Sequence, residues 1–158
     1  MIIISDTSVI TNLIQVGHLE VLEKLFKRVV IPQKVCDELL RIEGRANLFQ
    51  VNSWLEIKQV SDKSLYEKLL ERVDPGEAES IALALEHKAA LLLIDERKGR
   101  RVAEEYGLKI TGLIGILIDA KSGQHIGQIK PILDKLIYEI GFRISPTLYQ
   151  KVLAIAEE

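Results

Sequence analysis

The sequence predicts an α/β fold with a central parallel sheet of about four to five strands, flanked by helices. Short apolar runs at residues 1–5 and 90–94 are continuous rather than alternating. Such runs are typical of strands that are buried on both faces of a parallel sheet. Elsewhere, apolar residues recur with helical spacing. Strand-like and helical segments that alternate along one chain indicate helices that connect parallel strands.

The first half of the chain shows three strand signals with helices between them. Apolar residues recur every three or four positions in two segments separated by Gly17, which predicts two short helices. Proline favours the first helical turn and glycine often follows the last, so Pro32 and Gly44 bracket a third helix. The next strand alternates in hydropathy, as expected of an exposed edge strand. In order, the predicted elements are strand 1–5, helices 9–16 and 19–26, strand 28–31, helix 32–43 and strand 54–60.

The second half contains more helix than strand. Asp74 and Pro75 mark the start of a helix, Gly107 ends a basic helix, and Ser145 caps the last helix. No linker or repeat interrupts the pattern, so residues 1–158 are predicted to form a single domain, with 131–158 as a helical extension of it. In order, the predicted elements are helices 65–73 and 74–88, strand 91–94, helix 95–106, strand 108–111, and helices 113–121, 131–140 and 146–157.

Composition excludes several classes of protein. Hydrophobic residues make up 47% and charged residues 28% of the chain, which is typical of a globular protein. No apolar stretch approaches the roughly 18 residues of a membrane span, and no basic segment precedes the first apolar run, so we expect a cytoplasmic protein. Cys36 is the single cysteine and excludes an internal disulfide. The net charge of −2 argues against broad affinity for nucleic acid, but it permits a local basic surface.

Two apolar runs end at an aspartate: Asp6 follows the first, and Asp95 follows the run 90–94. Ligands of open α/β sheets bind outside the carboxyl ends of the strands, so both carboxylates are expected in one crevice. Two ionised carboxylates about 4 Å apart repel by about 4 kcal/mol at an effective dielectric of 20, unless a cation joins them. An aspartate after a strand also commonly caps the next helix. The sequence leaves both roles open.

Helical phase identifies two further acids that face inward. Glu38 falls at the margin of the apolar stripe of its helix, whereas Asp37 falls on the solvated side. Glu77 lies within the apolar stripe of the helix that follows Asp74, and Glu79 points away from it. A charge on an apolar stripe is costly unless it is paired, hydrogen-bonded or bound to a metal. Glu77 is also placed to form a capping box with Asp74.

These four acids (Asp6, Glu38, Glu77 and Asp95) come from four separate elements and offer only oxygen ligands. Neither cysteine nor histidine accompanies them, which favours Mg²⁺ or Mn²⁺ over zinc. A site of this kind fits metal-assisted hydrolysis of a phosphodiester.

Six short motifs occur in a characteristic order and spacing. They are 4–8 (ISDTS), 31–39 (IPQKVCDEL), 76–84 (GEAESIALA), 92–103 (LLIDERKGRRVA), 112–117 (GLIGIL) and 141–145 (GFRIS). Through these motifs the chain resembles the PIN-domain nucleases, specifically the branch of small toxin-like proteins related to VapC toxins. The resemblance implies a Rossmann-like PIN fold and an acidic pocket that binds Mg²⁺ or Mn²⁺ and cuts RNA. It further implies the toxin half of a toxin–antitoxin pair, with a small antitoxin protein as partner.

The resemblance assigns individual residues. Asp6 matches the family's first acid and Glu38 its second, and Asp95 matches the acid after the penultimate core strand. Glu77 stands where many PIN domains have aspartate, and its longer side chain leaves the number of metal ions open. Ser8 matches the small hydroxyl residue that helps to order the pocket.

The helix after Asp95 is basic. Its basic residues either form a rim that binds RNA phosphates or form a solvated helix face whose charge is balanced by nearby glutamates. Gly99 within this helix costs roughly 1 kcal/mol relative to alanine, which indicates close approach of a neighbouring element or of substrate. The RNA-binding candidates are Arg97, Lys98, Arg100 and Arg101.

Two other functions remain open. One is a PIN-like module that binds RNA or protein without catalysis, and the other is an aspartate-based phosphotransfer domain with Asp6 as nucleophile. Apolar residues of the last two helices also suggest a surface for a partner or for a homodimer.

Overall fold

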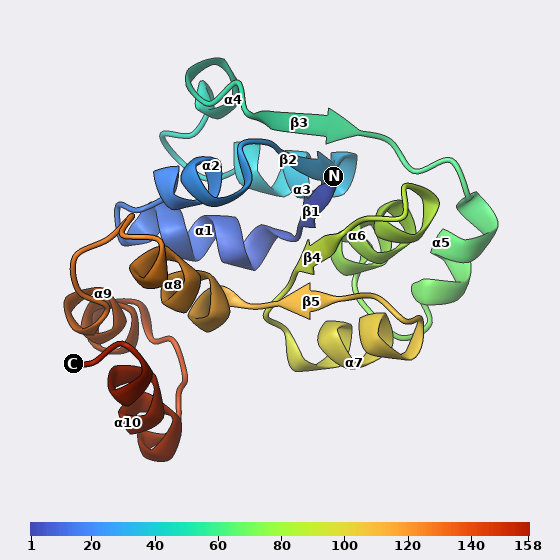
Figure 1. The fold of residues 1–158 in the computed structure, drawn as a ribbon. Helices are drawn as coiled ribbons and strands as arrows, with labels where there is room; N and C mark the ends of the chain where they lie inside the picture. Colours follow the sequence, from blue (N-terminus) through green and yellow to red (C-terminus); the bar gives the residue numbers. More distant parts are fainter.

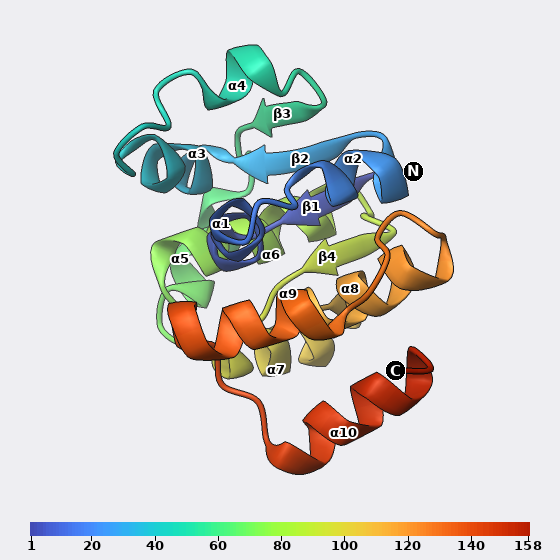
Figure 2. The same ribbon diagram turned by 90° about the vertical axis from the view of Figure 1, so that its left-hand side faces the viewer.

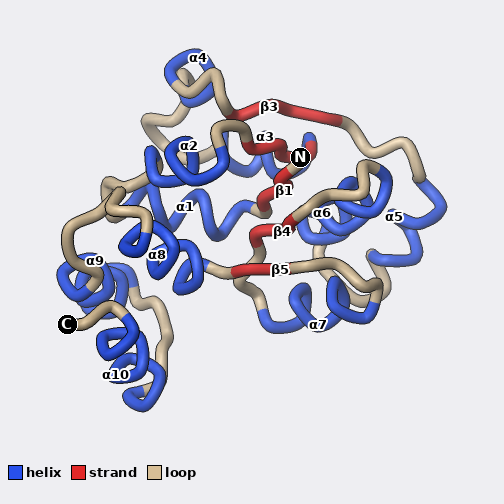
Figure 3. Tube along the Cα trace, viewed as in Figure 1, coloured by secondary structure: helices blue, strands red, loops and turns tan.

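The computed structural model describes all 158 residues and contains one five-stranded parallel sheet with strand order β3-β2-β1-β4-β5 (Figures 1 and 3). The α/β class, the parallel sheet and its flanking helices are confirmed. The strands are β1 (Ile3–Ser5), β2 (Val29–Pro32), β3 (Leu55–Lys58), β4 (Leu91–Leu93) and β5 (Ile110–Thr111). The helices are α1 (Thr7–Gln15), α2 (Glu20–Phe26), α3 (Gln33–Leu40), α4 (Leu48–Val51), α5 (Lys63–Leu69), α6 (Pro75–Glu86), α7 (Arg97–Glu105), α8 (Leu113–Ser122), α9 (Lys130–Lys135), the π-helical turn η1 (Leu136–Ile140) and α10 (Pro146–Ile155).

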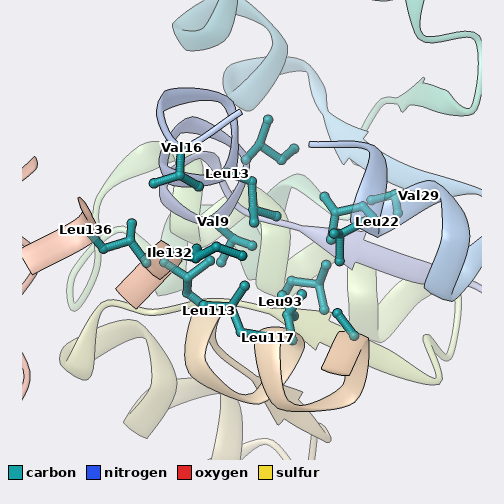
Figure 4. Packing of buried hydrophobic residues seen from close by; sticks show 14 of the residues in the cluster. Val9, Leu13, Val16, Leu22, Val29, Leu93, Leu113, Leu117, Ile132 and Leu136 are labelled. Atoms are coloured by element: carbon teal, nitrogen blue, oxygen red, sulfur yellow. The ribbon is translucent and has the colours of Figure 1, made fainter. Parts of the chain in front are cut away.

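Helices cover both faces of the sheet, and each face has its own hydrophobic core. The larger core holds 26 buried residues, contributed mainly by α1, α2, α3, α8 and α9. Figure 4 shows part of it, where Val9 and Leu13 of α1 pack near Leu113 and Leu117 of α8. The smaller core of 13 residues lies beneath α5, α6 and α7 on the opposite face. Burial on both faces explains why the central strands are continuously apolar rather than alternating.

The topology places a crevice between β1 and β4. From β1 the chain moves outward to β2 and β3, and it then returns to add β4 on the other side of β1. Ligands of such sheets bind outside the carboxyl ends of the strands where the order reverses. Ser5 is paired with Leu93, so the two strands end level with each other. Asp6 and Asp95 therefore follow the two strands that flank this point.

The C-terminal segment packs against the rest of the chain rather than standing apart. Leu133, Leu136 and Val152 are buried in the larger core, and Figure 2 shows α9 lying beside α1 and α8. The apolar excess of this segment is therefore mostly core, and only Leu148 and Ile155 of α10 are largely exposed, besides Tyr138 of η1. None of the helices combines the length and the apolar character needed to cross a membrane.

Element boundaries agree with the sequence to within a few residues, with two exceptions. Helix α4 was not predicted, because a four-residue helix is too short to show a 3.6-residue period. The single helix expected over 131–140 is instead α9 followed by the π-helical turn η1, which ends at Gly141 in the left-handed conformation.

Candidate acidic site

Three of the four predicted acids line one cavity at the carboxyl ends of the strands. This acidic cavity has a volume of about 320 Å³ and contains neither an apolar side chain nor a lysine or arginine in its lining. Lys98 lies beside Asp74, Glu77 and Glu96 in a neighbouring cavity, but outside the acidic cavity. The lining residues of the acidic cavity are Asp6, Thr7, Ser8, Thr11, Asn12, Glu38, Asp74, Glu77 and Glu96.

Asp6 is one of the two buried acids of this cavity, together with Glu77. It lies between β1 and α1 and is only 6% exposed. Although it occupies the N-cap position of α1, its side chain makes no capping hydrogen bond. The pKa of Asp6 is raised to about 7, chiefly by burial and in addition by the negative charges of Asp74, Glu38 and Asp95, while the Thr7 backbone N–H lowers it. The capping interpretation of Asp6 is therefore not supported.

Glu77 forms the predicted capping box and still has an unpaired oxygen. Its backbone N–H donates to Asp74 Oδ1 at 2.8 Å, and its Oε1 accepts from the Asp74 backbone N–H at 3.2 Å. Its Oε2 is buried with no hydrogen-bond partner. Burial in the first place, and the charges of Asp74 and Asp6 in addition, raise the pKa of Glu77 well above its usual range. The structural and the functional interpretations of Glu77 are thus compatible.

Glu38 is positioned by a hydroxyl group. The Thr7 hydroxyl donates to Glu38 Oε2 at 2.5 Å, which joins α1 to α3. Ser8, the residue expected to order the pocket, also lines the cavity, but its Oγ is buried and has no partner. Sequence reasoning missed the role of Thr7, because only the folded chain brings α1 beside α3.

Asp95 lies next to the acidic cavity and faces a second one. Its Oδ1 accepts from the Leu113 backbone N–H at the start of α8 at 3.0 Å, and its Oδ2 is buried without a partner. Burial raises the pKa of Asp95, while the Leu113 N–H and the Arg100 guanidinium lower it. Asp95 does not line the acidic cavity, although its charge contributes to the raised pKa of Asp6. The four acids are therefore close neighbours, but they do not share one cavity.

Three of these carboxylates lie directly against a glycine of another element. An added Cβ would fall within 3.0 Å of a carboxylate oxygen in each case, a distance that real Cβ atoms essentially never show. The expectation that Gly99 permits a close approach is confirmed, and the approaching groups are the Glu77 carboxylate and the Ile94 side chain. Measured from the added Cβ, the distance is 2.8 Å between Gly76 and Glu38 Oε1 and 2.5 Å between Gly99 and Glu77 Oε2, and a Cβ on Gly112 would overlap Asp95 Oδ1.

Two acids of the cavity were not predicted as site residues. They are Asp74, an exposed residue for which the sequence predicts only a helix cap, and Glu96. The signal for Glu96 is its position between the strand end at Asp95 and the start of α7. Glu79, expected to face away, lies outside the cavity and accepts a hydrogen bond from the Lys34 backbone N–H at 2.8 Å.

The basic residues of α7 divide between two surfaces. Arg97, Arg100 and Arg101 line the second cavity, next to Asp95, whereas Lys98 lies on the opposite side of the helix, near Asp74 and Glu77. Of the two glutamates of α7, Glu105 pairs with Arg72, in the loop between α5 and α6, whereas Glu104 lines the second cavity with the arginines. The group expected to act as one rim is thus split by the helical phase.

The residues present fit a hard divalent cation in chemistry and burial. They are oxygen ligands, the buried Oε2 of Glu77 and Oδ2 of Asp95 have no partner, and no protein cation enters the acidic cavity. No three acidic side chains approach closely enough to share an ion. Coordination by three of them therefore requires side chains to rotate from the positions seen here.

The fold and the site together define an acid-rich α/β domain with carboxylates at the strand ends. The chain belongs to the PIN-domain family: a family model described as "DUF3368: PIN domain" matches residues 2–158. PIN domains are generally nucleases and typically use divalent metal ions. No curated protein matches the sequence.

Proposed function

We propose that this PIN domain is a ribonuclease that requires Mg²⁺ or Mn²⁺ and hydrolyses RNA phosphodiester bonds. The observation that carries the proposal is a cavity lined by five acidic side chains and by no lysine or arginine. Buried carboxylates in such a cavity repel one another, and a bound divalent cation relieves that repulsion. A stable fold does not need this arrangement, whereas a metal site does.

Asp6, Glu38, Glu77 and Asp95 are the residues that would hold the ion. When bound, a divalent ion lowers the pKa of an attacking water and stabilises the negative charge that develops on the phosphate. The chain itself supplies orientation: Thr7 fixes Glu38, and the α8 backbone fixes Asp95. The glycines opposite three of the carboxylates leave the space that these side chains occupy.

The biological role that we propose is the toxin of a toxin–antitoxin pair. It is supported by the sequence motifs shared with VapC-like proteins. The partner would be a small antitoxin protein, and the exposed Leu148 and Ile155 offer an apolar surface for it or for a second copy of this chain. Expression of the chain alone should arrest growth, and co-expression of a short adjacent gene should relieve the arrest.

The test of ribonuclease activity is cleavage of single-stranded RNA with Mg²⁺ or Mn²⁺, with and without a chelator. We expect cleavage that stops when the metal is removed and that thiol reagents do not affect. The closest alternative is a PIN-like module that binds RNA without cutting it, because no three acids are yet in ligating positions. Binding without cleavage under any metal condition would favour that module, and cleavage that survives chelation would rule out the metal mechanism.

A further inference from the structure

A second cavity lies beside the acidic site and has a different character. It has a volume of about 730 Å³, which is within the range of small-ligand sites. Its walls come from α7, β5, α8 and the segment that leads from η1 into α10. Asp95 is part of its lining. We call it the arginine cavity.

One side of the arginine cavity is strongly cationic. Arg97, Arg100 and Arg101 of α7 line it together with Arg143 from the C-terminal segment, against two acids, Asp95 and Glu104. None of the four arginines forms an ion pair within the protein. Arg97, Arg101 and Arg143 are exposed, so their guanidinium groups are free to bind an anion. The planar guanidinium fork matches the oxygens of a phosphate.

The other side of the arginine cavity is apolar. Ile114 and Ile118 of α8 contribute to it, as does the ring of Phe142, which precedes Arg143. These side chains are only partly buried against the larger core and so retain surface toward the cavity. An aromatic ring beside arginines is a surface on which nucleic-acid bases stack.

We propose that the arginine cavity binds one nucleotide of a single-stranded RNA, adjacent to the bond that is cut. Its phosphate lies among the arginines and its base lies against Phe142 and the isoleucines of α8. The cavity ends at Asp95, which places this nucleotide next to the acidic site. The inference rests on the proposed ribonuclease function and adds to it a role for the C-terminal segment, which supplies Phe142 and Arg143.

The test is fluorescence anisotropy with a fluorescein-labelled single-stranded RNA of mixed sequence, in chelator so that metal-dependent cleavage is off. Arg143→Gln should weaken binding about tenfold. It should also make the negative slope of log K against log salt shallower by about one. Phe142→Leu should weaken binding about fivefold or more and leave the slope unchanged, because it removes stacking but no charge. Arg41→Gln is the matched control, since Arg41 is exposed, forms no ion pair and lies outside both cavities.

Failure of this proposal differs from failure of the ribonuclease function. If the parent protein cleaves RNA but both variants bind RNA with the affinity of the parent, RNA does not bind in the arginine cavity and the proposed nucleotide site is wrong. If the parent neither binds nor cleaves RNA, the proposed function falls as well. If the variants keep their RNA affinity but lose binding to the protein encoded by an adjacent gene, the cavity is a protein-binding site and the proposal is overturned. Arg143 is exposed, so its variant remains informative even where Phe142→Leu lowers stability.

Discussion

Replacement of Asp6 by asparagine should make the metal-free protein more stable, by an amount that grows with pH. Asp6 is buried in the acidic cavity, and its pKa rises from the usual 3.8 to about 7 on folding. A carboxyl group with a raised folded-state pKa holds its proton more tightly when folded. Its contribution to stability is therefore fully present below pH of about 4 and is lost as the pH rises toward 7.

The size of this effect follows from the pKa shift. A difference of about three pKa units corresponds to a loss of about 4 kcal/mol across the pH window from about 4 to 7. This value is an upper bound, because water and polar side chains in the cavity relax the penalty. Asparagine has nearly the same shape as aspartate and no charge. The stability of the Asp6→Asn variant should therefore not fall in this way as the pH rises.

Urea unfolding in chelator at pH 5 and pH 8 measures the effect. We expect Asp6→Asn to have a higher free energy of unfolding than the parent, and we expect this stabilisation to be about 1–3 kcal/mol larger at pH 8 than at pH 5. A difference that is equal at the two pH values would show that Asp6 is not desolvated as the structure indicates. A loss of about 1 kcal/mol at both pH values would mean instead that Asp6 is a helix cap.

Further substitutions separate the positioning of the carboxylates from the stability of the fold. Gly99→Ala places a Cβ 2.5 Å from Glu77 Oε2 and should therefore impair cleavage. It should lower the free energy of unfolding by less than about 2 kcal/mol, because the better helix propensity of alanine offsets part of the overpacking. Asp95→Asn keeps an acceptor for its backbone donor in α8 and should lose cleavage with little change in urea midpoint. Thr7→Val removes the hydroxyl donor to Glu38 and should reduce cleavage by about tenfold.

These outcomes can each fail separately. A fully active Gly99→Ala protein would mean that Glu77 can move without consequence. Cleavage by Asp95→Asn at the parent rate would place Asp95 among structural residues only. An unchanged rate for Thr7→Val would show that Glu38 needs no fixed orientation.

The sequence was sufficient to predict the sheet and most helices because their signals are local. Continuous apolar runs identify β1 and β4, and the helical phase of Glu77 and Glu79 correctly separates the side chain that lines the cavity from the one that does not. The capping box at Asp74 is likewise a signal of four consecutive residues.

What the sequence could not predict depends on contacts between distant elements. Asp95 faces a different cavity from Asp6 because the start of α8 captures one of its oxygens, 18 residues further along the chain. The helical period separates Lys98 from the three arginines, but which surface each side of α7 faces depends on how the helix packs on the rest of the chain, which no local period specifies. The proximity of Phe142 to α7 depends on the path of the chain between η1 and α10, a loop without periodic pattern.

Binding of Mn²⁺ tests the central claim most directly, namely that the acidic cavity is a divalent metal site. Mn²⁺ titrated at pH 8 and followed by the electron paramagnetic resonance of the free ion should show binding to the parent protein. Glu79→Gln, which keeps the acceptor for the Lys34 N–H outside the cavity, should bind like the parent, and Asp6→Asn should bind about tenfold or more weakly. Equal affinity of the parent and Asp6→Asn, or no binding by either, would contradict the account.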